Sequence, residues 1–519
     1  MPITRREFLI GAGAVAGASI VGVAGPAFGA AAVDPASANR NRLVIIFLEG
    51  GNDGLNYVVP RGDVPGAPRL SVYRKVRPAL AYAPSTLLPL DRGNDAAQML
   101  GFNPKLTHLH SLYRAGRVAV VQGVDYPNHN YSHFASSDIW HAGNPTNTST
   151  GWIGRHLDRV GVGEGELRAV AVSSKLPLML QGRGVSGASI ASIATMRFRD
   201  GTSATSNAKH AALAALGAAR ANDPLRQRVG ATLRQAVDVV ADLAKTDAPP
   251  ARSSAIGESL ETARTLLEQN LGVESVFVGY GGFDTHTTEV ATQEQLLADL
   301  DTALDAFWAG LNPSLAARTL VMIVSEFGRR IGQASGGFGI AGTDHGAAAP
   351  VVFVGPPQSS LVGGLHGDHP NMGTTAAPAD NLAMTTDVRH VYQAVLQSWL
   401  HNPDPLYNDA ESGPLHGLFD EANTAAGGRA RNGAAARLDG DGSASATSTS
   451  SAVLGERASR RRSALGFGGS GTSNGGGRSV PLSSATAALA FNAFVAAVVV
   501  RSGRFREALA SWRDDDAAL

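Results

Sequence analysis

The chain has 519 residues, and its 44 basic and 44 acidic side chains give it no formal net charge. This balance gives no indication of binding to nucleic acid or to an anionic membrane. The sequence contains no cysteine, which excludes thiol catalysis, thiolate zinc sites and iron–sulfur clusters, so a metal would need histidine, carboxylate or hydroxyl ligands.

Residues 1–32 have the pattern of a twin-arginine signal peptide. An arginine pair in Thr4–Leu9 is followed by the apolar run Phe8–Ala24 and by small residues around Ala27–Ala30 that suit a signal peptidase. The alternative is a general secretion signal; a membrane anchor is disfavoured because the run is rich in Gly and Ala. We expect the twin-arginine translocase to export the folded chain to the periplasm or the extracellular space, which suits a protein that loads metal inside the cell.

Short apolar runs rich in β-branched residues predict buried strands, and helical patterns alternate with them. The predicted strands are Leu43–Leu48, Val118–Val121, Ala169–Val172, Ser275–Val278, Thr319–Val324 and Val351–Val354. The predicted helices are Ala208–Leu243, Ile256–Leu271, Thr288–Leu311 and Asp387–Leu400. This alternation predicts an α/β fold with a mostly parallel central sheet and helices on both faces. We expect one domain over residues 40–422, with a helical insertion at about 208–272.

The composition changes after about residue 422. Residues 425–480 consist mainly of Gly, Ala, Ser and Arg without a hydrophobic period, which predicts a disordered low-complexity tail that continues to residue 519. The apolar segment Ala485–Val500 is short for a membrane span and ends at Arg501. A short helix is the favoured interpretation of this segment, and membrane association is the alternative.

Polar clusters follow the carboxyl ends of four predicted strands, and a fifth cluster precedes the last strand. Because sites in open parallel sheets lie outside the strand carboxyl ends, we expect these clusters to converge. Their carboxylates and imidazoles form an oxygen and nitrogen ligand set that suits zinc, manganese, magnesium or calcium. The candidate site residues are Asp53, Ser132, Asp284, His286, Glu326, Arg329, Asp344 and His345.

Each candidate also has a structural interpretation. Asp53 lies in a turn sequence, and Ser132 suits the cap of a helix that begins at the next residue. Glu326 can form a local ion pair with Arg329, and the acidic and imidazole side chains of the other loops can bond to each other. The metal site is therefore predicted from the conjunction of the clusters and not from any single member.

The clusters resemble those of an exported bacterial family known as domain of unknown function 1501. The resemblance covers roughly residues 40–402 and rests on the segments Glu49–Asn56, Asn130–Phe134, Gly282–His286, Ser325–Arg329 and Thr343–Gly346. Members are similar to alkaline phosphatases and sulfatases, which implies an alkaline-phosphatase-like fold and metal-dependent hydrolysis of phosphate or sulfate esters. Such members tend to be encoded beside a second exported family, which implies an exported partner protein.

The resemblance to the phosphatase and sulfatase superfamily also implies roles for individual residues. Asp53 is similar to the first metal-binding aspartate, and Asp284 and His286 are similar to ligands of the other metal site. Ser132, at a predicted helix start that can help to bind an anion, resembles the nucleophile. Arg329 or Arg330 would neutralise charge on the transferring group.

The later motifs match the superfamily less well. Glu326 stands where the aspartate of an Asp-His pair is expected, and His345 resembles the late histidine ligand. Phe327, however, replaces the histidine of that pair. In an alternative alignment Asp344 and His345 form the pair, and a histidine in Leu365–Pro370 is the late ligand. These departures also allow a different function, a non-catalytic exported binding or assembly protein with a degenerate site.

Overall fold

The computed structural model describes residues 39–161, 166–193, 250–269, 271–334, 340–403 and 413–420. The predicted export signal at 1–32, the predicted helix Ala208–Leu243 and the predicted tail from 425 onward lie outside these residues. In the described part of the chain, no helix combines the length and the apolar composition needed to cross a membrane.

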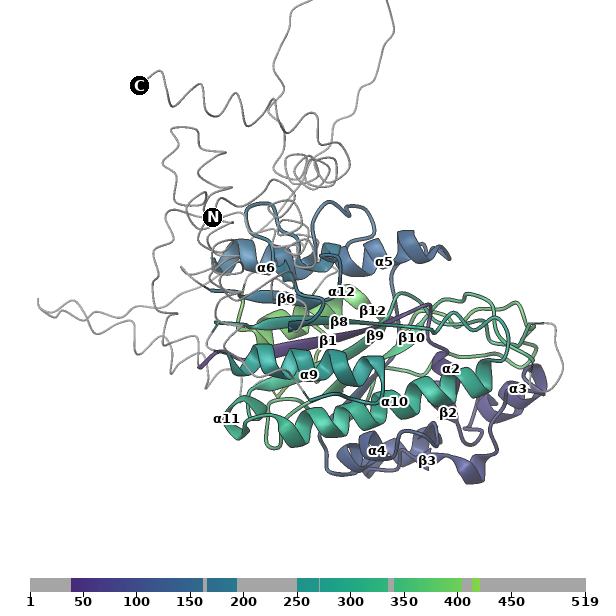
Figure 1. Ribbon diagram of the computed structural model, residues 1–519. Helices are drawn as coiled ribbons and strands as arrows, with labels where there is room; N and C mark the ends of the chain where they lie inside the picture. Colours follow the sequence, from purple (N-terminus) through teal and green to yellow (C-terminus); the bar gives the residue numbers. More distant parts are fainter. Residues whose placement is uncertain are drawn as a thin grey trace, which may run out of the picture.

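A sheet of nine strands runs through the described part of the molecule (Figure 1). Its strands are β1 (Arg42–Glu49), β5 (Val118–Asp125), β6 (Ala169–Val172), β7 (Ala188–Ser189), β8 (Ser275–Gly281), β9 (Thr319–Ser325), β10 (Ala349–Val354), β11 (Gly364–His366) and β12 (Thr386–Asp387). The order across the sheet is β11-β5-β10-β9-β1-β8-β6-β7, and β12 also pairs with β5. Strand β10 is antiparallel to both neighbours, and the other pairs are parallel. The predicted α/β fold with a mostly parallel sheet is confirmed, as are all six predicted strands.

Strand β1 shows why a continuous apolar run forms a central strand here. It pairs in parallel with β8 on one side and β9 on the other, and residues 42 to 48 are buried. Val44 and Ile46 belong to the hydrophobic core on one face of the sheet, and Leu43 and Ile45 belong to the core on the other face. Because alternate side chains point to opposite faces, a strand that is covered on both faces needs apolar residues at every position.

Helices cover both faces of the sheet, as predicted (Figure 1). One face carries α4 (Thr107–Arg114), α9 (Ala255–Glu268) and α10 (Glu289–Gly310), and the other carries α5 (His133–Ala142), α6 (Trp152–Val160) and α12 (Val388–Ala394). Helix α9 was expected within a helical insertion, but it packs against α10, β8 and β6 in the main core. The predicted helix Asp387–Leu400 is divided into α12 and a π-helical turn over Val395–Trp399.

Short helices and a second, small sheet are formed by the chain between β1 and α4. A second sheet has the order β2-β4-β3 and is antiparallel. These elements are α2 (Gly54–Tyr57), β2 (Val58–Pro60), α3 (Arg69–Val76), β3 (Leu88–Pro89) and β4 (Leu100–Phe102), and a short helix α11 (Pro313–Ala316) precedes β9. Helix α2 begins directly after the first strand-end cluster, because the Asp53 carboxylate accepts a hydrogen bond from the amide of Leu55 and caps the helix.

The register of the three central strands brings their carboxyl ends to one edge. Glu49 of β1 lies beside Gly281 of β8, and Leu48 lies beside Ser325 of β9. The loops that follow these strands therefore leave the sheet next to one another, which is the arrangement that positions a site in open α/β folds.

A buried ion pair joins the amino-terminal ends of the neighbouring strands β8 and β6. Glu274, just before β8, contacts the guanidinium of Arg168, just before β6, and its carboxylate lies 3.6 Å from Nε2 of His156. Burial by itself raises the pKa of Glu274. The close contact with His156 and the charge of Arg168 outweigh burial and lower the pKa to about 2.

Replacing Glu274→Gln is expected to lower the free energy of unfolding at pH 7 by about 3 kcal/mol, because the positive partners lose their buried counter-charge. The folded pKa lies below the ordinary value of 4.5, so this stabilisation is present above pH 4.5 and is lost as the pH falls toward 2. Urea denaturation of both proteins should show a difference that falls to about half between pH 7 and pH 3. A difference that does not change with pH would contradict the assignment.

Candidate metal site

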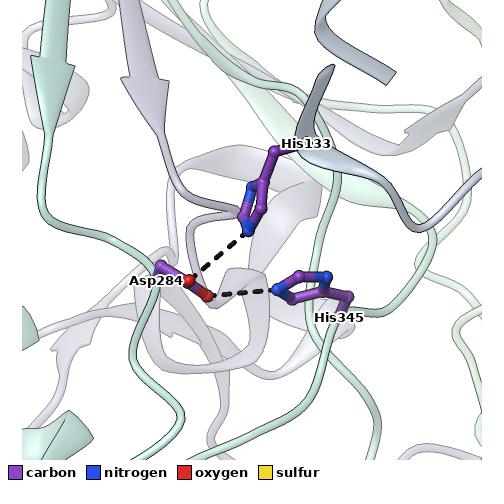
Figure 2. A group of neighbouring side chains, drawn as sticks. All are labelled: His133, Asp284 and His345. Carbon is purple, nitrogen blue, oxygen red and sulfur yellow. Dashed lines mark hydrogen bonds and ion pairs between the residues drawn. The ribbon is translucent and has the colours of Figure 1, made fainter. Parts of the chain in front are cut away.

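Imidazole and carboxylate side chains converge at the edge where the central strands end. Figure 2 shows His133, Asp284 and His345 pointing toward one another. Their ligand atoms all lie within 4.8 Å of each other. Nε2 of His345 is 3.1 Å from Oδ1 of Asp284, and Nε2 of His133 is 3.4 Å from Oδ2. The three side chains come from the start of α5, the loop after β8 and the loop before β10.

A third imidazole completes this group. Nε2 of His286 lies 2.9 Å from Oδ1 of Asp284 and 3.0 Å from Nε2 of His345. Ligand atoms around a tetrahedral zinc ion with bonds of about 2.0–2.1 Å are about 3.3 Å apart. The three Nε2 atoms lie 2.9–3.4 Å from the carboxylate oxygens of Asp284, which is close to this spacing.

Hydrogen-bond acceptors orient two of the imidazoles from behind. Nδ1 of His133 lies 2.8 Å from Oε1 of Glu326, a buried carboxylate that also accepts a hydrogen bond from a backbone amide. Nδ1 of His345 lies 2.8 Å from the backbone carbonyl of Tyr131. Both partners are acceptors, so Nδ1 carries the proton in each ring and the lone pair of Nε2 faces Asp284.

The imidazole of His286 is oriented in the same way. Its Nδ1 lies 3.1 Å from Oδ1 of Asp344, so a carboxylate again lies behind the ring. Histidines that bind metals almost always donate their other ring N–H to a carboxylate or a carbonyl. All three histidines of this group have such a partner. Nε2 of His133 is also buried and has no hydrogen-bond partner among the described residues, as expected for an atom whose lone pair a metal ion would satisfy.

Phe327 forms an apolar wall beside the ligands. Its ring is fully buried, and its centroid lies 5.0 Å from that of His133 and 4.7 Å from that of His345. Gly51 makes room for this ring, since it has a φ of +78° and a Cβ there would lie 2.3 Å from the ring. The resemblance in the sequence implied a histidine ligand at this position, and the structure has instead an apolar ring that packs against two imidazoles.

The charge states of the group suit a cation. Burial raises the pKa of Asp284, but the hydrogen bond and the positive charge of Arg329 outweigh burial and lower the pKa to about 2. Burial lowers the pKa of His345 below its usual value. At neutral pH the carboxylate is therefore ionised and this imidazole is neutral, which are the forms that bind metal ions.

Arg329 holds the loops of the site together and is enclosed by them. The guanidinium is buried, and its nitrogen atoms donate hydrogen bonds of 2.5–2.9 Å in several directions. The acceptors are the carbonyls of Gly50, Gly51, Phe283 and Thr343 and the carboxylate of Asp284. The sequence suggested that Arg329 would face the transferring group, but its donors are already directed to the protein.

Asp53 lies outside the ligand group. Its carboxylate forms a two-fold pair with the guanidinium of Arg77, with N–O distances of 2.5 and 3.0 Å, and both side chains are buried. Burial raises the pKa of Asp53, and the charge and hydrogen bonds of Arg77 outweigh it and lower the pKa. Asp53 was expected to bind a metal, but in the structure its negative charge is paired with an arginine.

Ser132 precedes His133 at the start of α5. Its side chain is exposed and, within the described residues, does not cap the helix. The hydroxyl is therefore free to meet a ligand from solvent, although it takes no part in the hydrogen bonds that join the cluster.

His133 is the group member that the sequence did not identify. It directly follows Ser132 in a strand-end motif, so the motif contained it, but the resemblance implied a role for the serine and none for the histidine. The alternative late ligands lie elsewhere: Nε2 of His366 is 2.7 Å from the carbonyl of Val362, and Nδ1 of His369 is 2.8 Å from that of Pro370.

A family comparison agrees with the motifs that form the site. Residues 40–411 match the profile of the family described as "Protein of unknown function (DUF1501)". The chain belongs to the DUF1501 family. No curated protein matches the sequence significantly.

Solved structures that are similar to this DUF1501 chain share 10–12% sequence identity with it. The alignment with the alkaline phosphatase TAB5, in a variant with magnesium bound, covers 61% of this chain and 91% of the phosphatase chain, with a TM-score of 0.27. The alignment with a 2-O GAG sulfatase covers 73% of this chain and 74% of the sulfatase chain, with a TM-score of 0.29. The alignment with the phosphonate monoester hydrolase of Agrobacterium radiobacter covers 73% of this chain and 77% of the hydrolase chain, with a TM-score of 0.28. Likenesses this weak support no inference about the reaction.

The role of Arg329 in this DUF1501 chain can be tested with Arg329→Lys. A single ammonium group cannot serve acceptors that lie in so many directions, so we expect the free energy of unfolding to fall by about 3 kcal/mol or more. The neighbouring Arg330→Lys is the matched control and should cost less than about 1 kcal/mol. Chemical denaturation measures both. If Arg329→Lys leaves stability unchanged, the side chain does not hold the loops.

Proposed function

We propose that this chain is an exported hydrolase of phosphate or sulfate esters that uses a single divalent metal ion. The ligands would be His133, Asp284, His286 and His345. The observation that carries the proposal is the convergence of three Nε2 atoms on one ionised carboxylate, with every Nδ1 held by an acceptor. Arg329 contacts one oxygen of this carboxylate, but without a metal ion the Nε2 lone pairs would still face one another and the negative charge of Asp284.

The donor set favours zinc among the metals that the sequence suggests. Imidazole ligands suit zinc, whereas magnesium and calcium prefer sites built from oxygen ligands alone. Three nitrogen ligands and one carboxylate are therefore a poor match for magnesium or calcium. The partly exposed side chains of Asp284 and His286 leave the site open to a ligand from solvent.

When bound, the metal ion would supply a Lewis acid that polarises a non-bridging oxygen of the ester. The chain itself would contribute the attacking group: Oγ of Ser132 would bond to phosphorus or sulfur, and its proton would leave with the released alcohol. Water would then hydrolyse the serine ester. The amino-terminal end of α5 begins at His133, so its dipole favours an anionic group beside Ser132.

Export is the second part of the proposal. It is supported by the arginine pair in Thr4–Leu9 and by the apolar run that follows, which suit the twin-arginine translocase. A protein that is exported after folding can load its metal inside the cell and act in the periplasm or outside the cell.

A specific observation also favours a second candidate function. The pairing of Asp53 with Arg77 and the presence of Phe327 leave a single group of ligands among the described residues, where the resemblance implied two metal sites. Such a site would suit an exported binding or assembly protein that uses the metal ion for stability and acts through a partner protein.

The metal site can be tested on the full chain purified without chelators. Elemental analysis is expected to find about one zinc ion per chain. Asp284→Ala should weaken zinc binding about 100-fold or more, because it removes the only charged ligand of the group. Asp305→Ala is the control, since Asp305 is an exposed acid of α10 that pairs with His108 and should not affect the metal. A wild-type chain without metal, or an Asp284→Ala variant that keeps it, would contradict the site.

Ser132→Ala separates the two candidate functions. If the chain is a hydrolase, this variant should keep its zinc and lose about 10³-fold or more of its rate on aryl phosphates or aryl sulfates. Ser137→Ala, one turn further along α5, should retain the wild-type rate. Full activity in Ser132→Ala would exclude the serine as nucleophile, and a zinc-loaded wild-type chain that hydrolyses no ester would favour the binding protein.

A further inference from the structure

A buried carboxylate lies behind the metal site, and the proposed reaction does not use it. Glu289 is the first residue of α10 and is fully buried. Its Oε2 accepts a 2.6 Å hydrogen bond from the hydroxyl of Thr343. Its backbone amide donates a 3.1 Å hydrogen bond to the carbonyl of Ala341. The first residue of α10 therefore holds the loop before β10 at two points.

Thr343 is the point at which this loop is fixed. Besides the bond to Glu289, its carbonyl accepts a 2.7 Å hydrogen bond from Arg329, and its amide donates a 3.2 Å hydrogen bond to the carbonyl of Thr285. Thr343 is fully buried. The next two residues are Asp344 and His345, so the position of Thr343 determines where both of these side chains begin.

We propose that Glu289 is a positioning residue of the metal site, which fixes the loop carrying Asp344 and His345 through the hydroxyl of Thr343. This inference rests on the proposed metal site. Ligands must be held within about 0.5 Å of their productive positions to bind a metal tightly. Loss of the bond to Thr343 would allow His345 to move away from Asp284 while the core of the domain remains intact.

The Asp53–Arg77 pair supports Glu289 from the other side. Burial, followed by the negative charge of Asp53, raises the pKa of Glu289 well above its ordinary value, so the carboxyl is neutral and hydrogen-bonds to Asp53. Arg77 also donates 2.7 Å hydrogen bonds to the carbonyls of Ile331 and Arg330. The network thus joins α10 to the segment after β9 as well as to the loop before β10.

This network gives Asp53 a role in the absence of a metal contact. Its carboxylate holds Arg77 on one side and Glu289 on the other, and it caps α2. The aspartate that resembles a ligand in the superfamily would here support the ligands from behind.

The test compares three full-length variants with the wild type. Glu289→Ala is expected to weaken zinc binding by about 10- to 100-fold, the range typical of groups that orient metal ligands. Glu289→Gln keeps an oxygen that accepts from Thr343, so its zinc affinity should stay within about 3-fold of the wild type. Zinc affinity is measured by competition with a chelator, and thermal stability is measured separately in the absence of zinc.

Asp301→Ala is the matched control for general destabilisation. Asp301 is a buried acid on the same helix, but it accepts hydrogen bonds from the hydroxyl of Thr107 and the amides of His108 and Leu109, on α4. This variant is expected to lose stability and keep wild-type zinc affinity. If it weakens zinc binding as much as Glu289→Ala does, the effect of Glu289 is general and the proposal fails.

Thr343→Val provides a second route that does not alter Glu289. Removing the hydroxyl should weaken zinc binding to a similar extent as Glu289→Ala, and the double variant should be little weaker than either single variant, because both remove the same bond. Wild-type zinc affinity in Glu289→Ala, or fully additive losses in the double variant, would overturn the positioning role. A wild-type chain that binds no zinc would instead overturn the proposed metal site on which this role rests.

Discussion

The guanidinium of Arg329 joins the loops that leave the central strands, and the geometry of the site depends on it. Gly50 and Gly51 have φ values of +118° and +78°, so their carbonyls turn toward the arginine. A Cβ on Gly50 would lie 2.3 Å from the amide of Asp284, so this close approach is open only to glycine. The same buried cation keeps the Asp284 carboxylate ionised. One side chain thus sets both the shape of the loops and the charge at the centre of the cluster.

The carboxylates that hold the histidines differ in burial from one side of the site to the other. His133 is backed by the buried carboxylate of Glu326, whereas His286 is backed by the exposed carboxylate of Asp344. Burial lowers the effective dielectric constant, so the first of these contacts is the stronger orienting force. The side of the site at His286 is therefore the one at which solvent and a ligand have access, and the side at His133 is the rigid one.

Much of the fold follows from patterns in the sequence. The strands that were predicted are long enough for a continuous apolar run, whereas β7 and β12 contain two residues each and have no pattern to detect. The antiparallel direction of β10 was also not predictable, because a buried strand has the same composition in either direction. The helical pattern at 255–268 was recognised, but composition does not reveal that this helix packs into the main core.

The sequence predicted where in the fold the site lies, but not which side chains contact one another there. The strand-end rule brings Asp284 and His286 to the edge where the central strands end. His345 precedes β10 and reaches the same edge because β10 runs antiparallel to its neighbours. No rule of spacing shows that Asp53 faces Arg77, a partner 24 residues away in a different helix region. Equally, the sequence does not show which carboxylates point at the centre and which stand behind an imidazole, since both arrangements need the same residue types.

The four side chains of the cluster come from positions 133, 284, 286 and 345, on three separate loops. The segments between them supply β6, β8 and β9. A growing chain cannot assemble the complete set until the last of these positions has emerged and β5, β8 and β10 have paired into one sheet. Capture of the proposed metal ion would accordingly be a late step in the maturation of the chain, and the bound ion would report that these strands have paired.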